Sequence, residues 1–302
     1  MRARIRDTEI FFDIEGAGLV ADGVHMREKP VCFLIHGGPG GDHTGTKAVC
    51  APLAAKMQLV YFDHRGQGRS ARGDPQAYTL DENVEDMEAL RAHLGLGPIV
   101  SIGTSYGGVV AMAHAARYPE AVSHLVLIVT AAHAGFILRA AEILRERGTA
   151  EQRSLFEDLF AGRIDTPEKM RRYFEVMGSL YACKYDAAAA KQRLERAILE
   201  PEAFNRVYGP SGCLRHFDFR PRLKAITAPT LIIAGRHDWI CPPEFSQEIH
   251  ELIPDSDLRI FEGSSHAVLG DETQACLDAI AGFIVYKTRM SRGCSSAQHK
   301  SR

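Results

Sequence analysis

Three residues of this 302-residue chain have the types and the chain order of a nucleophile, an acid and a base: Ser105, Asp238 and His266. Ser105 stands in a Gly-Thr-Ser-Tyr-Gly stretch at 103–107, directly after an apolar run and directly before a run of small residues. This pattern predicts a strand, a tight turn and a helix, because glycine tolerates backbone geometry that other residues do not. Such a turn raises the serine hydroxyl above the edge of a sheet, where it can attack a carbonyl carbon.

The candidate acid and base also follow predicted strands. Asp238 comes after the apolar run 229–234, and His266 comes after a short strand-like run at 258–261. In sites built on this kind of serine turn, the chain order is nucleophile, acid, base, which is the order found here. We therefore expect His266 to accept the proton of Ser105 while Asp238 holds the imidazole in the required tautomer.

Two backbone N–H groups are candidates for binding the oxyanion that forms when a serine attacks a carbonyl. One belongs to Tyr106, directly after the serine. The other belongs to Gly38, in a His-Gly-Gly-Pro-Gly stretch at 36–40 that follows the apolar run 31–35. The candidate substrate contacts around these groups are Gly37, Tyr208 and Trp239.

Other polar and aromatic residues are expected to have structural roles. Asp63 should fix the loop 63–70 by hydrogen bonding, and His36 should support the glycine loop from behind. No histidine or cysteine spacing matches a metal site, so we expect no metal and no cofactor. Aromatic residues are frequent between 131 and 217, and we expect one or two of them to face the substrate. They are Phe136, Phe156, Phe160, Tyr173, Phe174, Tyr181, Phe204 and Tyr208.

Composition argues against several classes of function. Lys and Arg number 36 against 38 Asp and Glu, a net charge of −2, so nothing points to nucleic acid. No apolar run approaches the roughly 18 residues of a membrane span, and residues 1–7 do not resemble a signal peptide. Seven scattered cysteines fit a reducing compartment. We expect a cytoplasmic protein that acts on a small molecule or a short peptide, with its oligomeric state left open.

The elements that must position these residues form an α/β pattern. Strand and helix signals alternate over 1–130 and again over 218–286, which predicts a mostly parallel sheet with helices on both faces. Between them, 131–217 has only helical signals and reads as a helical cap inserted over the site. The polar, serine-rich stretch 287–302 is expected to be disordered.

Five motifs in order make the chain resemble the α/β-hydrolase superfamily and, within it, the proline iminopeptidase family of serine peptidases. The resemblance extends over residues 31 to about 270. It implies that the chain cleaves an amide or ester bond of a small substrate through an acyl-enzyme, with the triad named above and no cofactor. The motifs are His-Gly-Gly-Pro-Gly at 36–40, Asp-His-Arg-Gly-Gln-Gly-Arg-Ser at 63–70, Gly-Thr-Ser-Tyr-Gly-Gly at 103–108, Gly-Arg-His-Asp at 235–238 and Gly-Ser-Ser-His at 263–266.

One departure from the family pattern leaves the substrate open. Members often carry Gly-Pro-Asn-Glu late in the cap, where the Glu helps to hold the substrate's α-ammonium. Here Gly212 stands at the position of that acid, so the ammonium contact is missing unless Glu175, Glu195, Glu202 or another cap acid supplies it. A buried ammonium needs a paired carboxylate. A carboxylesterase, lactonase or amidase without need of a free amine is therefore an alternative, as is a non-catalytic ligand-binding homologue.

Overall fold

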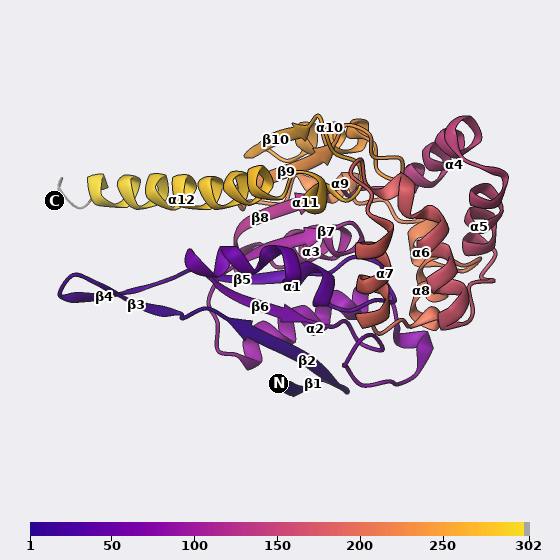
Figure 1. The fold of residues 1–302 in the computed structure, drawn as a ribbon. Coiled ribbons are helices and arrows are strands. Elements are labelled where there is room, and N and C mark those ends of the chain that lie inside the picture. The colour runs from indigo at the N-terminus through magenta and orange to yellow at the C-terminus, as the bar shows by residue number, and fades with distance from the viewer. Residues whose placement is uncertain (299–302) are drawn as a thin grey trace.

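The computed structural model describes the backbone of residues 1–298 and the side chains of residues 1–287. Its centre is an eight-stranded sheet with the order β1-β2-β6-β5-β7-β8-β9-β10, drawn in Figure 1. The pairings β1–β2 and β2–β6 are antiparallel and the others are parallel. The strands are β1 (Arg2–Ile5), β2 (Thr8–Glu15), β5 (Val31–Ile35), β6 (Gln58–Phe62), β7 (Ile99–Thr104), β8 (Val122–Ile128), β9 (Thr230–Gly235) and β10 (Ser256–Phe261).

The central strands are continuous apolar runs because both of their faces are buried. On β5, Phe33 and Ile35 belong to one hydrophobic cluster, whereas Cys32 and Leu34 belong to another. Helices supply the opposite side of each cluster. The first includes side chains of α2 (Leu80–His93), α3 (Tyr106–Arg117), α9 (Arg220–Leu223) and α10 (Pro243–Leu252), and the second includes α1 (Thr44–Cys50), α11 (Val268–Asp271) and α12 (Thr273–Gln298).

Five further α-helices lie between β8 and β9 in the chain and gather at one end of the sheet, opposite the end where α12 projects (Figure 1). Four of them contribute side chains to a third hydrophobic cluster, which includes Leu144, Met170 and Phe204, and α7 contributes none. The sequence indicated only helices over residues 131–217. The helices are α4 (Gly135–Arg147), α5 (Ala150–Phe160), α6 (Pro167–Tyr181), α7 (Ala187–Arg196) and α8 (Pro201–Tyr208), and short 3₁₀ helices occur at Ala51–Ala55, Pro75–Ala77, Pro119–Ala121 and Cys213–Arg215.

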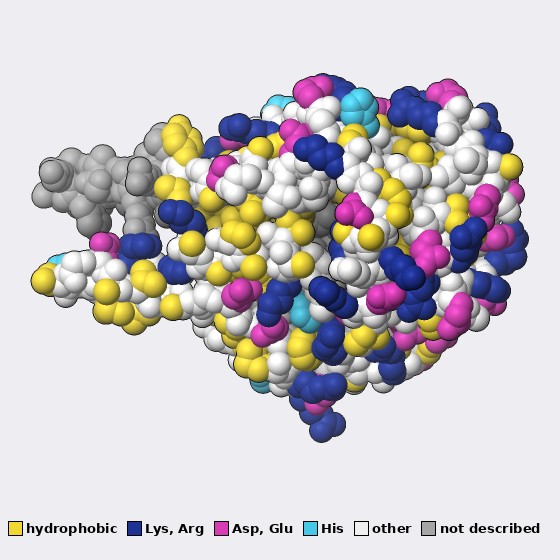
Figure 2. All heavy atoms as spheres, viewed as in Figure 1, with side chains coloured by type: hydrophobic (Ala, Val, Ile, Leu, Met, Phe, Trp, Pro, Cys, Tyr) yellow, Lys and Arg dark blue, Asp and Glu magenta, His cyan; other side chains and the backbone are white. Residues whose placement is uncertain are grey.

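Two segments differ from the sequence-based expectation. The hairpin of β3 (Leu19–Asp22) and β4 (His25–Glu28) carries no buried side chain, so it lacks the apolar alternation that would have revealed it. Figure 2 shows hydrophobic side chains on this projecting hairpin, where Val24 is 94% exposed. In the stretch 287–302, which was expected to be disordered, the structure continues helix α12 as far as Gln298. Residues 299–302 lie outside the described residues.

None of the helices within residues 1–298 has the length and apolarity that crossing a membrane requires.

Candidate active site

Ser105 occupies a strained backbone turn between β7 and α3. Its φ of 56° and ψ of −120° lie outside the regions that non-glycine residues ordinarily adopt. The flanking glycines are required by space: a Cβ at Gly103 would lie 2.2 Å from the Gly107 carbonyl oxygen, and one at Gly107 would lie 2.2 Å from the Ile35 carbonyl oxygen. The Ser105 N–H donates to the Ile128 carbonyl at 2.8 Å, which ties the turn to β8.

The structure brings His266 and Asp238 to this serine. His266 Nε2 lies 3.0 Å from Ser105 Oγ, and His266 Nδ1 lies 2.8 Å from Asp238 Oδ2. The other carboxylate oxygen, Oδ1, accepts the N–H groups of Ile240 and Cys241 at 2.8 and 3.1 Å. Asp238 and His266 are buried, with exposed fractions of 2% and 7%. The carboxylate is therefore fixed by its own turn and presents one free oxygen to the imidazole.

The candidate oxyanion donors lie beside the serine. Tyr106 is the first residue of α3, so its N–H has no acceptor within the helix. Gly38 has a φ of +112° and lines the cavity in front of Ser105. A Cβ at Gly37 would come within 3.2 Å of the Ser105 Cβ, which shows how closely the glycine loop packs on the serine.

Residues 198–208 also hold this glycine loop. Tyr208 Oη donates to the Gly38 carbonyl at 2.8 Å, and the Glu200 N–H donates to the Gly40 carbonyl at 2.7 Å. The Ile198 N–H donates to Asp42 Oδ2 at 3.1 Å. The segment 198–208 and the loop 36–42 therefore form one hydrogen-bonded unit.

A cavity of about 210 Å³ opens in front of Ser105 and His266, between the sheet and the helices of residues 135–208. One or two of the eight aromatic residues of 131–217 were expected to face it, and that expectation was wrong, because all eight line it. The amphipathic cap helices turn their aromatic faces toward a shared space, a convergence that helical periodicity alone does not reveal. Gly37, Tyr208 and Trp239, the candidate substrate contacts, also lie on its wall. The full lining is Gly37, Gly38, Ser105, Phe136, Ala140, Phe156, Leu159, Phe160, Tyr173, Phe174, Tyr181, Phe204, Tyr208, Trp239, Ile240 and His266.

Comparison with known proteins agrees with this architecture. The model of the alpha/beta hydrolase fold family matches residues 30–273. The chain is 32% identical to a proline iminopeptidase, PfmaB, of Pestalotiopsis fici over 85% of this chain and 92% of that protein. This chain is an α/β hydrolase.

Further similarities extend over most of the α/β hydrolase. A proline iminopeptidase of Lactobacillus helveticus is 29% identical, over 82% of this chain and 86% of that protein. Among solved structures, the proline iminopeptidase of Mycobacterium smegmatis has a TM-score of 0.76 at 23% identity, covering 96% of this chain and 99% of that one. The enol-lactonase of Burkholderia xenovorans has a TM-score of 0.67 at 22% identity, covering 94% and 100%. At such identities the two structures show a shared fold.

The α/β hydrolase has no carboxylate on the cavity wall within the part of the chain whose side chains are described. A Cβ at Gly212 would lie 2.1 Å from the Val207 carbonyl oxygen, so this position accepts no side chain without a backbone shift. Glu175, Glu195 and Glu202 are all exposed and none lines the cavity. Nothing on the wall therefore replaces the acid that the family pattern places in the cap.

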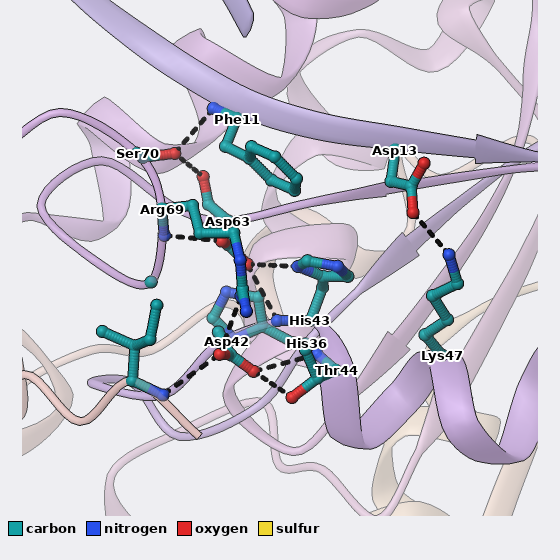
Figure 3. A network of polar contacts seen from close by, with 12 residues as sticks. Phe11, Asp13, His36, Asp42, His43, Thr44, Lys47, Asp63, Arg69 and Ser70 are labelled. Atoms are coloured by element: carbon teal, nitrogen blue, oxygen red, sulfur yellow. Dashed lines mark hydrogen bonds and ion pairs between the residues drawn. The ribbon is translucent and has the colours of Figure 1, made fainter. Parts of the chain in front are cut away.

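Asp63 lies in a polar network that includes His43, Arg69 and Ser70 (Figure 3). Its carboxylate accepts the N–H and Nδ1–H of His43 at 2.8 and 2.7 Å and the N–H of Arg69 at 2.7 Å. Burial opposes ionisation, but the His43 hydrogen bond and nearby histidine charge outweigh it, so the pKa of Asp63 is lowered. His36 lies nearby, with Nδ1 2.8 Å from the Gly37 carbonyl oxygen, and burial lowers its pKa. Both residues make the loop-supporting contacts expected from sequence.

Replacing Asp63 by Asn is expected to destabilise the α/β hydrolase by about 1.5–3 kcal/mol, because a buried charged acceptor is lost. Urea unfolding of both proteins measures this difference. The pKa of Asp63 is lower in the folded than in the unfolded protein. The extra free energy of unfolding of the wild type should therefore be complete above the unfolded-state pKa of about 3.9, and it should be lost as the pH falls through the folded-state pKa. Equal stability of the two proteins at neutral pH would contradict this role.

The acidic group Asp7, Glu82 and Asp86 is the candidate metal cluster found within the described residues. Arginines already neutralise it: Arg65 Nε lies 2.6 Å from Asp86 Oδ2, and Arg6 Nη1 lies 2.9 Å from Asp86 Oδ1. None of the three acids lines the cavity. Their geometry is that of an ion-pair network.

Proposed function

We propose that the chain is a serine hydrolase that cleaves esters or amides through an acyl-enzyme. His266 removes the proton of Ser105 as its oxygen attacks the substrate carbonyl, and Asp238 stabilises the imidazolium that results. The N–H groups of Tyr106 and Gly38 bind the oxyanion. His266 then protonates the leaving alcohol or amine and later activates the water that releases the acid. The observation that carries this proposal is the Ser105–His266–Asp238 hydrogen-bond chain, with distances of 3.0 and 2.8 Å, at the wall of a cavity.

We further propose that the substrate presents a neutral apolar group, and that residues 131–217 act as the cap that encloses it. The aromatic wall supports this class, because burying an ammonium there would remove its hydration and supply no carboxylate in return. The second candidate is an aminopeptidase of the proline iminopeptidase type. Similarity to the proline iminopeptidases of Pestalotiopsis fici and Lactobacillus helveticus favours it, and the exposed positions of Glu175, Glu195 and Glu202 count against it.

A matched pair of substrates separates the two candidates. We expect kcat/KM for L-proline 4-nitroanilide and for its N-acetyl derivative to differ by less than about tenfold, which is about 1.4 kcal/mol. An enzyme that anchors the free amine on a carboxylate should instead lose about 3–5 kcal/mol on acetylation. The comparison also includes 4-nitrophenyl butyrate, which should be hydrolysed.

The same measurements on Ser105→Ala give the rate of hydrolysis that does not involve the proposed site, and this rate is subtracted from that of the wild type. A preference for the free amine above tenfold would show that an acid reaches the cavity. The neutral-substrate proposal would then be dropped in favour of the aminopeptidase.

A further inference from the structure

The C-terminal end of α6 is hydrogen-bonded to the loop that carries His266, on both sides of that residue. After it, the Ala267 N–H donates to the Tyr181 carbonyl at 2.7 Å. Before it, Ser265 Oγ lies 2.8 Å from the Leu180 carbonyl oxygen. The Tyr181 ring also meets the imidazole edge to face, with ring centroids 5.5 Å apart. The position of the proposed base therefore depends on a helix that the chain inserts between β8 and β9.

Asp271 joins the same two segments through its carboxylate, and the residue is buried, with 4% of it exposed. Its Oδ2 accepts the N–H groups of Cys183 and Ser265, both at 3.0 Å, and its Oδ1 accepts the Lys184 N–H at 2.8 Å. Lys184 Nζ in turn donates to the Asp271 carbonyl at 2.8 Å. One carboxylate thus holds both the residue before His266 and the turn that follows α6.

The neighbouring Glu272 also holds this loop, but in a different way. Its Oε2 accepts the Gly263 N–H at 3.0 Å and the Ser264 hydroxyl at 2.6 Å. These contacts stay within the loop and do not reach α6. Asp271 uses both of its carboxylate oxygens and Glu272 uses one for these contacts. The two residues are therefore a natural pair for testing what the link to α6 does.

We propose that Asp271 is a positioning residue for His266. This inference rests on the proposed function, because it explains how the base of that site is held in place. Asp271 does not line the cavity, so it acts on the reaction through the loop and not through a contact with the substrate. Proton transfer requires His266 Nε2 to stay at its 3.0 Å distance from Ser105 Oγ. A misplacement of about 1 Å at a catalytic group can reduce the rate by about 100-fold.

Replacing Asp271 by Ala removes all three acceptor contacts, and kcat for 4-nitrophenyl butyrate is expected to fall by about 100-fold. The proposed base acts in both acylation and deacylation, so poorer proton transfer slows both steps, and KM should stay within about threefold of the wild-type value. Rates are taken under conditions in which urea unfolding curves show each variant to be folded. A purely structural residue would lower the free energy of unfolding and leave kcat per folded molecule unchanged.

Asp271→Asn and Glu272→Gln are an isosteric pair, and they decide the question even if the alanine variant does not fold. In Asp271→Asn, an amide oxygen at the Oδ2 position keeps Cys183 and Ser265, but the NH₂ group then faces the Lys184 N–H, and that hydrogen bond is lost. Its kcat should fall by about 3- to 10-fold, the range of one hydrogen bond. In Glu272→Gln, one amide oxygen can keep both contacts, so kcat should stay within about twofold of the wild-type value.

Equal kcat values for Asp271→Asn and Glu272→Gln overturn the proposal. A raised KM with unchanged kcat in either Asp271 variant also overturns it, because the carboxylate would then affect only binding. Ser105→Ala is assayed with the same ester. If that variant is inactive while both Asp271 variants turn over normally, this inference alone fails. If turnover persists in Ser105→Ala, the proposed function fails, and the assignment of His266 as its base fails with it.

Discussion

Replacing Ser105 by Ala is expected to reduce ester and amide hydrolysis by about 10⁴- to 10⁶-fold, the range seen when a nucleophile of a catalytic triad is removed. The physical reason is that Ser105 Oγ is the atom that His266 Nε2 contacts at 3.0 Å, and alanine leaves the imidazole with nothing to deprotonate. A fluorophosphonate probe should label the wild-type protein and leave the variant unlabelled.

Ser101→Ala is a matched control for this experiment. It makes the same chemical change four residues earlier on β7, where the buried Ser101 Oγ has no partner among the described residues. This variant should keep its labelling and its turnover. Turnover of Ser105→Ala above about one-hundredth of the wild-type rate would show that another group is the nucleophile.

Replacing Asp238 by Asn is expected to lower kcat by about 10⁴-fold. The two backbone N–H groups that Oδ1 accepts fix which way the new amide points. Its oxygen must stay toward Ile240 and Cys241, so its NH₂ group must face His266 Nδ1. That nitrogen would then have to accept a hydrogen bond, which moves the ring proton to Nε2 and prevents it from taking the Ser105 proton.

The Asp63→Asn variant is the matched control for Asp238→Asn, because both changes remove a buried carboxylate that contacts a histidine. Asp238→Asn should reduce kcat with little change in unfolding, and Asp63→Asn should do the reverse. If the two variants exchange these behaviours, Asp63 is the acid that orients the base.

The parts of the fold that a sequence reveals are those in which geometry restricts residue type. The turn at Ser105 was recognisable because Gly103 and Gly107 leave no room for a Cβ, and the central strands were recognisable because burial of both faces demands continuous apolar runs. The same logic gave the placement of Asp238 and His266, since both follow strands that end at one edge of a parallel sheet.

The parts that were missed depend on contacts between distant segments. The hairpin β3–β4 has no buried face to impose a period on its residues. The number of aromatic residues that face the cavity was underestimated. The direction in which Phe156 or Phe174 points depends on how the helices of 131–217 pack on one another. The glycine at 212, where the family pattern has an acid, could be located in the sequence. The exposure of Glu175 and Glu202 depends on how the helices pack and could be known only from the fold.

The hydrogen bonds between residues 198–208 and the glycine loop couple the opening of the cavity to the position of the loop beside Ser105. If α8 moves away from the sheet to admit a substrate, the contacts of Tyr208 with Gly38 and of Glu200 with Gly40 must break. The loop that carries Gly38, the proposed oxyanion donor, then loses its restraint when a substrate enters and regains it on closure. Entry of the substrate and formation of the oxyanion site would then depend on the same movement of α8. Hydrogen exchange of the Ile198 and Glu200 amides would measure the rate of this movement.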